Sequence, residues 1–188
     1  FSGGKAIGGP QASGILAGRR DLVGAALVQQ IDMDVAPATW SPPSLIDRAK
    51  LNGVPHHGIG RGFKAGKEEI VGLLVALERF VGIDDEATNA ALQRRLEAIG
   101  RALEGVRGVG CRVVPAAVTG RAPVLELAID PGAAGCSAIE LSGRLQQGDP
   151  PVHLSERFTA RGVLTVDPQV LQPEDDAALA SAVRRAVG

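Results

Sequence analysis

The sequence predicts a mixed α/β chain in two parts, residues 1–82 and residues 83–188. Three observations support this fold class. A glycine-rich loop with a short apolar segment opens the chain, helical periodicity dominates its middle, and short apolar strands alternate with helices beyond residue 110. We expect the first part to end in a linking helix and the second part to form a small α+β domain.

The first part is expected to contain one strand and two helices. Residues 12–17 are apolar and bounded by glycine, which predicts a buried strand, and Asp21 is placed to cap a helix to about residue 30. Residues 34–62 are rich in proline and glycine, which predicts a long irregular segment. An amphipathic helix should follow, because six apolar residues share one face at helical spacing: Ile70, Leu73, Leu74, Leu77, Phe80 and Val81.

The second part is expected to be a layered α+β unit. A helix over residues 84–105 should begin at Asp84 and Asp85, because acidic side chains favour a helix N-terminus. Further predicted elements are strands at 111–118 and 124–129, a helix at 135–147, strands at 152–158 and 162–166, and a helix at 173–186. This order predicts helices on one side of a mostly antiparallel sheet.

Composition excludes several classes of function. The chain is 45% hydrophobic and 22% charged, which suits a packed core, and its net charge of −1 gives no electrostatic basis for binding nucleic acid. No apolar run approaches the roughly 20 residues of a membrane span. Cys111 and Cys136 have neither metal-site nor redox spacing, so we expect buried free thiols, no metal site and a cytoplasmic location.

Residues 1–11, Phe-Ser-Gly-Gly-Lys-Ala-Ile-Gly-Gly-Pro-Gln, form the densest motif of the chain. A Schiff-base lysine needs a neutral amine and close approach of the backbone, and the glycines around Lys5 provide the space. Glycine, serine and lysine also occur in ordinary flexible loops, so the tetrapeptide at residues 2–5 is weak evidence by itself. The spacing of a nucleotide-binding phosphate loop is absent.

The longer pattern resembles the selenocysteine-synthase-like family of pyridoxal-phosphate (PLP) enzymes. Residues 1–22 resemble the segment with the PLP lysine, and residues 59–74 resemble in particular the D-glucosaminate-6-phosphate ammonia-lyase branch. Residues 148–152 and 164–171 resemble the family's C-terminal domain. The resemblance implies an aspartate-aminotransferase-type fold (fold type I), of which this chain is the C-terminal portion, with residues 1–82 ending the PLP-binding large domain.

The resemblance also implies residue roles. Lys5 would form the Schiff base with PLP and move a proton at the substrate's Cα, and Ser2, Gly3, Gly4 and Gly9 would line the cofactor pocket. The residues expected to contact an anionic group of substrate or cofactor are Arg61, Lys64, Lys67 and His57. A solvated helix start is the alternative for Lys67, and an ordinary loop residue is the alternative for His57.

One position departs from the family. Ser155 stands near the place where the family carries an arginine, and Arg157 or Arg161 is close enough in sequence to replace it. If that arginine binds a substrate carboxylate, this departure bears on which substrate is accepted.

The predicted function is a PLP-dependent lyase or transferase acting on an amino acid or amino sugar acid, in an ammonia-lyase-like elimination. A homodimer or larger assembly is implied, and we expect this portion alone to be inactive. The alternatives are an L-seryl-tRNA(Sec) selenium transferase, a non-catalytic oligomerisation module derived from such an enzyme, and, more remotely, a glycine-loop nucleotide binder.

Overall fold

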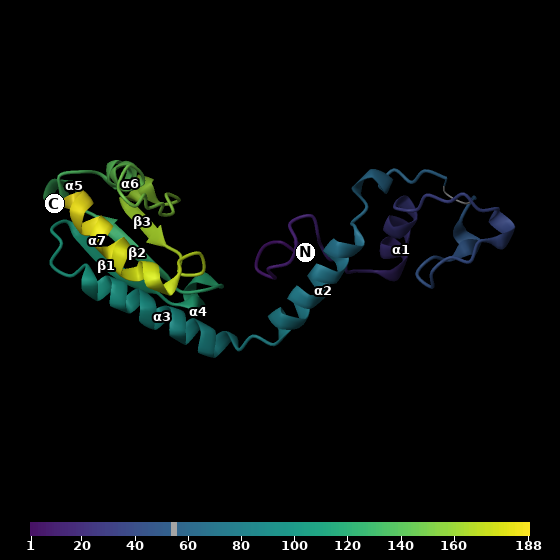
Figure 1. Cartoon of the computed structure of the whole chain (residues 1–188), viewed down its shortest axis with the longest axis horizontal. Coiled ribbons are helices and arrows are strands. Elements are labelled where there is room, and N and C mark those ends of the chain that lie inside the picture. The colour runs from purple at the N-terminus through teal and green to yellow at the C-terminus, as the bar shows by residue number, and fades with distance from the viewer. Residues whose placement is uncertain (54–55) are drawn as a thin grey trace. The chain divides into compact units, whose positions relative to one another are not determined.

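The computed structural model describes residues 1–53 and 56–188. Within it the chain divides into two compact units, unit 1 (Phe1–Ile83) and unit 2 (Asp84–Gly188), both visible in Figure 1. No helix in the described part of the chain is long and apolar enough to cross a membrane.

Unit 2 is built on a three-stranded antiparallel sheet in the order β1-β2-β3. The strands are β1 (Val109–Val114), β2 (Val124–Ile129) and β3 (Val163–Val166). In the register, Leu127 lies between Cys111 of β1 and Leu164 of β3. The predicted antiparallel sheet is therefore confirmed, with three strands.

Three helices pack against the sheet and form the core of unit 2. They are α3 (Asp85–Ala102), α6 (Ala138–Gln146) and α7 (Asp176–Val187). Alternate residues of β2 point into this core, so that Leu125 and Leu127 are fully buried while Ala128 is exposed. Helix side chains complete the core: Leu96, Ile99, Leu141, Leu145, Leu179 and Val183.

Local capping interactions explain where the helices of unit 2 begin. Asp84 accepts a hydrogen bond from the backbone N–H of Ala87 at 3.0 Å and so caps α3. In α6, Ser137 and Glu140 form a reciprocal capping box. A short turn, η5 (Pro173–Asp175), leads into α7.

Three predicted boundaries in unit 2 are wrong. The first strand ends at Val114, because Pro115 starts the short helix α4 (Ala116–Thr119). Residues 152–158 make only one isolated bridge with the described residues, between Ser155 and Thr165, and the N–H of Val152 donates to the carbonyl of Leu145 in α6 at 2.9 Å rather than to a strand. The helix expected at 135–147 begins later, at Ala138, because Gly135 ends the separate short helix α5 (Pro131–Ala134) in a left-handed conformation and Ser137 caps α6. One more short turn, η4 (Thr159–Arg161), precedes β3.

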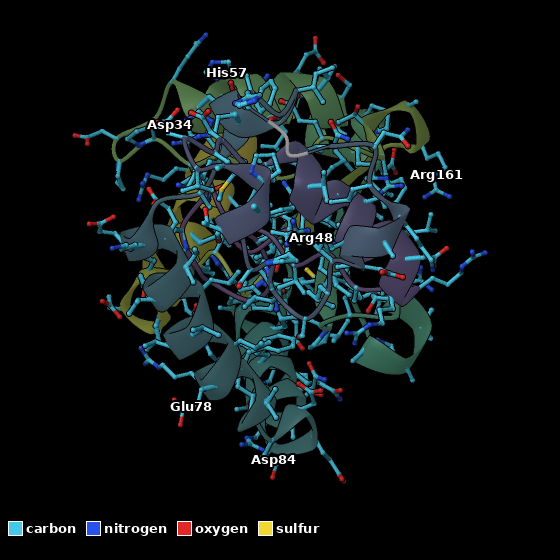
Figure 2. The ribbon with its side chains drawn as sticks, turned by 90° about the vertical axis from the view of Figure 1, so that its right-hand side faces the viewer. Asp34, Arg48, His57, Glu78, Asp84 and Arg161 are labelled. Atoms are coloured by element: carbon cyan, nitrogen blue, oxygen red, sulfur yellow. The ribbon has the colours of Figure 1, made fainter. Side chains whose placement is uncertain are left out.

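Unit 1 consists of two helices joined by a long irregular segment. The helices are α1 (Arg20–Gln29) and α2 (Lys67–Val81), and the turns between them are η1 (Pro37–Thr39), η2 (Arg48–Lys50) and η3 (Arg61–Phe63). Arg48, labelled in Figure 2, donates hydrogen bonds to the carbonyl oxygens of Trp40, at 3.0 Å, and Pro37. This guanidinium ties together a segment that has little regular hydrogen bonding of its own.

Two predictions for unit 1 are wrong. Residues 12–17 form no strand; Gly14 makes a single bridge with Ser2, and this segment lacks the neighbouring strands that a sheet requires. Asp21 does not cap α1, because its carboxylate binds Arg19 at 2.6 Å. This ion pair lowers the pKa of Asp21, but both side chains lie largely in solvent, where such pairs contribute little.

Helix α2 is confirmed, but most of its apolar face is not covered within unit 1. Leu73 is buried, whereas Ile70, Leu74 and Val81 are at least half exposed. The amphipathic pattern therefore predicts the helix correctly without indicating which residue meets a partner.

Candidate functional site

Lys5 lies at the tip of a loop that is closed by backbone hydrogen bonds. The N–H of Gly9 donates to the carbonyl of Gly3 at 2.8 Å, and the N–H of Gly8 donates to the carbonyl of Lys5 at 2.8 Å. Gly8 has a φ of 73°, a conformation that favours glycine. The Lys5 side chain is exposed and has no hydrogen bond or ion pair with any described residue. The described part of the chain therefore leaves the Lys5 amine exposed and without a polar partner.

The predicted pocket glycines are required by the packing of this loop. A Cβ on Gly3 would lie 2.2 Å from the hydroxyl oxygen of Ser13 and 2.8 Å from a methyl carbon of Leu73. A Cβ on Gly4 would lie 2.7 Å from the Cα of Gln11. In Figure 1 the loop beside the N label lies against α2, in agreement with the contacts to Leu73. The glycines thus serve to hold the loop on α2, which fixes the backbone on both sides of Lys5.

A second cluster forms around Asp32, just after α1. Its carboxylate accepts from Nε of Arg61 at 3.4 Å and lies 3.0 Å from Nδ1 of His57. Asp32 is only 28% exposed, whereas the His57 side chain is 85% exposed and is labelled at the outer edge of Figure 2. The carboxylate therefore orients two cationic or ionisable side chains. His56, the other histidine of this loop, lies with its Nδ1 3.2 Å from the carbonyl oxygen of Met33.

Close backbone packing holds this cluster in place. The N–H of Gly60 donates to the carbonyl of Gln29 at 2.8 Å, and the N–H of Gly58 donates to the carbonyl of Ile31 at 3.0 Å. A Cβ on Gly58 would lie 2.0 Å from the carbonyl oxygen of Gln29. The glycines on either side of residue 59 thus allow η3 to dock on the end of α1, which places Arg61 beside Asp32.

Arg61 and Lys64 line one hollow of about 720 Å³ in unit 1. Its lining also includes Gly14 and Leu16, in the segment that bridges to Ser2. The loop that carries Lys5 and the cationic hollow therefore share the segment 12–16, although Lys5 itself does not line the hollow.

Two further residues predicted to contact an anionic group do not line this hollow. Lys67 is the first residue of α2, is exposed and does not line the hollow, which fits a solvated helix start. His57 also lies outside the lining and reaches the hollow only through Asp32. Sequence reasoning missed Asp32; the available signal was its position directly after an apolar helix, in Ile-Asp-Met-Asp.

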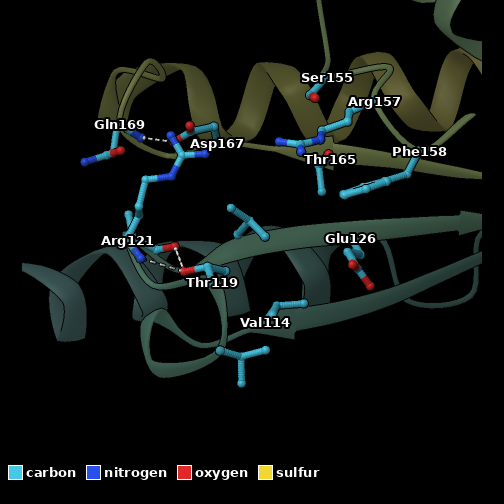
Figure 3. A pocket seen from close by; sticks show the side chains of 13 residues that line it. Val114, Thr119, Arg121, Glu126, Ser155, Arg157, Phe158, Thr165, Asp167 and Gln169 are labelled. Atoms are coloured by element: carbon cyan, nitrogen blue, oxygen red, sulfur yellow. Dashed lines mark hydrogen bonds between the residues drawn. The ribbon is translucent and has the colours of Figure 1, made fainter. Parts of the chain in front are cut away.

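In unit 2 the structure separates Arg157 and Arg161, the two candidates for the arginine that the resemblance predicts near Ser155. Arg157 lines a pocket together with Ser155 (Figure 3). Arg161 instead stacks on the Phe158 ring, with its guanidinium carbon 4.4 Å from the ring centroid, and does not line that pocket. Within residues 1–53 and 56–188 no group of three or more histidine, cysteine or acidic side chains is arranged to hold a metal ion.

Comparison with known proteins finds relatives but no matching family model. A 5'-C-glycyluridine monooxygenase-decarboxylase from a Streptomyces species is 29% identical over 185 residues, 98% of this chain and 39% of that protein. The D-glucosaminate-6-phosphate ammonia lyase of Salmonella typhimurium is 25% identical over 184 residues, 98% of this chain and 42% of that protein. The chain thus spans about two fifths of the length of the curated relatives it matches.

A solved ammonia-lyase structure is also similar to this chain. The structure of a D-glucosaminate-6-phosphate ammonia-lyase matches 69% of this chain and 34% of its own, with a TM-score of 0.56 and 25% sequence identity. This chain resembles part of an ammonia lyase. The resemblance supports the ammonia-lyase branch at low identity and agrees with part of a PLP-enzyme fold, whereas the selenium-transferase branch stays a prediction.

Proposed function

We propose that this chain is part of a PLP-dependent lyase that acts on an amino acid or amino sugar acid, with Lys5 as the residue that binds the cofactor. The observation that carries the proposal is the similarity to an ammonia lyase over 98% of the chain, which includes the loop of Lys5. Both named relatives are enzymes, and the solved ammonia-lyase structure shares the fold.

The residues present fit the cofactor in part. Lys5 offers an exposed amine on a loop whose backbone is fixed, which suits attachment to an aldehyde. Arg61 uses only its Nε on Asp32, and its two terminal nitrogens have no hydrogen bond with the described residues. Arg61 and Lys64 line the same hollow, and their cationic groups suit an anionic group of cofactor or substrate.

The chemistry divides between cofactor and protein. When bound, PLP would act as the electron sink that makes the substrate's Cα acidic. Lys5 would hold the cofactor and would move a proton at the substrate's Cα. Arg61 and Lys64 would orient the substrate through its negative charge, and Asp32 would hold Arg61 in position.

Trapping the cofactor tests the role of Lys5. The protein that carries this chain is mixed with PLP, reduced with borohydride and digested, and the labelled peptide is identified by mass spectrometry. We expect the label on Lys5 and its loss in Lys5→Ala. Lys50→Ala is the matched control, because Lys50 is an exposed lysine of the same unit that pairs only with Asp47. A label that remains in Lys5→Ala, or that lies on another lysine of the unaltered protein, contradicts the proposal.

The alternatives make different predictions. A non-catalytic oligomerisation module would assemble without binding PLP, and a selenium transferase would require seryl-tRNA. A homodimer or larger assembly stays a prediction, and sedimentation of the protein with and without PLP checks it. Ammonia release from phosphorylated amino sugar acids, absent in Lys5→Ala, would support the lyase.

A further inference from the structure

Helix α1 borders two separate cavities in unit 1, and the proposed function uses only one of them. The hollow of Arg61 and Lys64 is lined by residues 23, 26, 27 and 30 of α1. A second cavity, of about 650 Å³, is lined by the opposite face of this helix and by residues 44–47 and 50–51. We name it the α1 cavity. Among the described residues, Leu45 alone lines both spaces.

The segment that completes the lining of the α1 cavity is fixed on the helix. Arg20, at the start of α1, donates a hydrogen bond to the carbonyl oxygen of Ser44. Gly24 lies directly under the segment, because a Cβ there would be 2.4 Å from the carbonyl oxygen of Leu45. Ile46 is only 7% exposed and anchors the segment in the interior of unit 1. Both walls of the cavity are therefore formed before any ligand binds, as is usual for small-molecule sites.

The interior of the α1 cavity is mostly apolar. Ala25 and Val28 line it from the helix, and Leu45, Ile46 and Leu51 line it from the segment. Its volume lies within the range of roughly 300–1,000 Å³ that is typical of small-molecule sites. An apolar ligand body is favoured in such a space, since binding removes the apolar surfaces of both ligand and protein from water.

The charges of the lining offset one another except at one residue. Asp21 pairs at 2.6 Å with Arg19, which lies outside the lining. Asp47 and Lys50 pair with each other at 3.6 Å. In the part of the chain that the structure describes, Arg20 makes no ion pair, and its hydrogen bond goes to a neutral carbonyl oxygen. The α1 cavity thus combines an apolar interior with one uncompensated guanidinium.

We propose that the α1 cavity binds a small organic anion with a flat apolar body, an aromatic carboxylate, whose charged group pairs with Arg20. The guanidinium has further N–H groups beside the one bound to Ser44, and it stays charged at any physiological pH. The ring of the ligand would lie against Ala25 and Val28. The site takes no residue from the loop of Lys5, so the proposal does not depend on the proposed function.

Benzoate is the probe that tests the proposal, because it has a flat apolar ring and one negative charge at neutral pH. Calorimetric titration of the protein that carries this chain measures the affinity at constant ionic strength. Benzyl alcohol keeps the ring without the charge, and inorganic phosphate keeps the charge without the ring. We expect saturable binding of benzoate, with both control compounds binding at least about tenfold more weakly.

Photolabelling locates the bound ring. The protein is irradiated with para-azidobenzoate, and the modified peptides are identified by mass spectrometry. We expect labels within residues 20–28 and 44–51, and their suppression by excess benzoate. Labels confined to residues 12–16 or 61–65 would place the anion in the hollow of Arg61 and would overturn the proposal.

Substitutions on α1 separate the role of the charge from that of the cavity. Arg20→Gln should weaken benzoate binding about tenfold, because it removes the charged donor, and should leave the weaker binding of benzyl alcohol unchanged. Ala25→Leu fills the cavity from an exposed helical position and should abolish the binding of both compounds. Gln29→Leu is the matched control, because it adds the same side chain at an exposed position of α1 outside the lining.

Three further results would contradict the proposal. One is the absence of saturable benzoate binding. Another is an equal weakening of benzoate and benzyl alcohol in Arg20→Gln, which would mean that Arg20 only holds Ser44 in place. The third is an equal loss of binding in Ala25→Leu and Gln29→Leu. The fluorescence of Trp40, which is buried in unit 1, checks that each variant keeps its fold.

Discussion

An ion pair between α3 and α7 should contribute measurably to the stability of unit 2. Arg95 donates two hydrogen bonds to the carboxylate of Asp176, at 3.0 and 2.7 Å, and a third to the carbonyl of Leu171 at 3.0 Å. Both charged side chains are 21% exposed, and the pair joins two helices far apart in the chain. We expect Arg95→Ala to destabilise this unit more than any change at an exposed arginine.

The expected size follows from the contacts. Hydrogen bonds to a charged group contribute about 1.5–3 kcal/mol each when they are independent. Ordering an arginine side chain costs about 2 kcal/mol, and partial desolvation of both charges offsets more. We therefore expect Arg95→Ala to lower the free energy of unfolding by about 2–3 kcal/mol. For a unit of this size the melting temperature should fall by about 8–12 °C.

Two spectroscopic probes separate the units. Trp40 is the only tryptophan of the chain and lies buried in unit 1, so its fluorescence reports on that unit, whereas far-ultraviolet circular dichroism includes the helices of unit 2. In Arg95→Ala the dichroism transition should move to lower denaturant concentration and the Trp40 transition should not. Arg94→Ala is the control, because Arg94 is exposed and makes no hydrogen bond with the described residues. If both variants unfold alike, or if Arg95 and Asp176 show no coupling in a double-mutant cycle, the reasoning is refuted.

Three further predictions concern unit 2. Gly108→Ala should lower the free energy of unfolding by about 3 kcal/mol, because a Cβ there would lie 2.3 Å from the backbone nitrogen of Ala134 and the residue has a positive φ. Gly105→Ala is the control, since Gly105 has a similar φ but open space around it, and it should lower the free energy of unfolding by only about 1 kcal/mol. Equal losses in the two variants would contradict the clash. The pKa of Glu140 is lowered from 4.5, chiefly by the hydrogen bond from the backbone N–H of the N-cap residue, so its contribution to stability is complete above that ordinary pKa and is lost as the pH falls through the lowered folded-state pKa. Glu140→Gln should therefore reduce the loss of stability on acidification below about pH 4.5, measured by urea unfolding at a series of pH values, and an unchanged pH profile would count against this assignment. Cys111 is exposed, contrary to the expected buried thiol, but partial desolvation and the charge of Glu104 raise the pKa of this thiol above its usual 9.0. Iodoacetamide should therefore alkylate Cys111 more slowly in the folded than in the urea-unfolded protein, followed by mass spectrometry; equal rates would exclude the raised pKa.

The sequence patterns predict the periodic elements well. Alternation of the buried Leu125 and Leu127 with the less buried Glu126 and Ala128 defines β2, and the spacing of Leu96 and Ile99 defines the core face of α3. These predictions succeed because burial on one face of a strand or helix imposes a period on the residues themselves. The strand expected at residues 12–17 fails, because an apolar segment becomes a strand only when neighbouring strands satisfy its backbone.

The same division applies to the candidate site. The local string of glycines around Lys5 indicates a constrained loop, and the structure shows that Leu73 of α2 and Ser13 are the groups that make Gly3 necessary. The pairing of Asp32 with Arg61 could not be predicted, since it depends on how η3 docks on the end of α1. The separation of Arg157 from Arg161 is similar, because only the fold decides which guanidinium lies over the sheet.

By itself, the sequence determined the antiparallel sheet of unit 2, the helices that cover it, and the loop that presents Lys5, because these follow from periodicity and from the limited backbone angles of particular residues. The tertiary structure alone decided which charged side chains meet. Ion pairs and pockets join residues tens of positions apart, and their geometry depends on packing angles that no local pattern encodes.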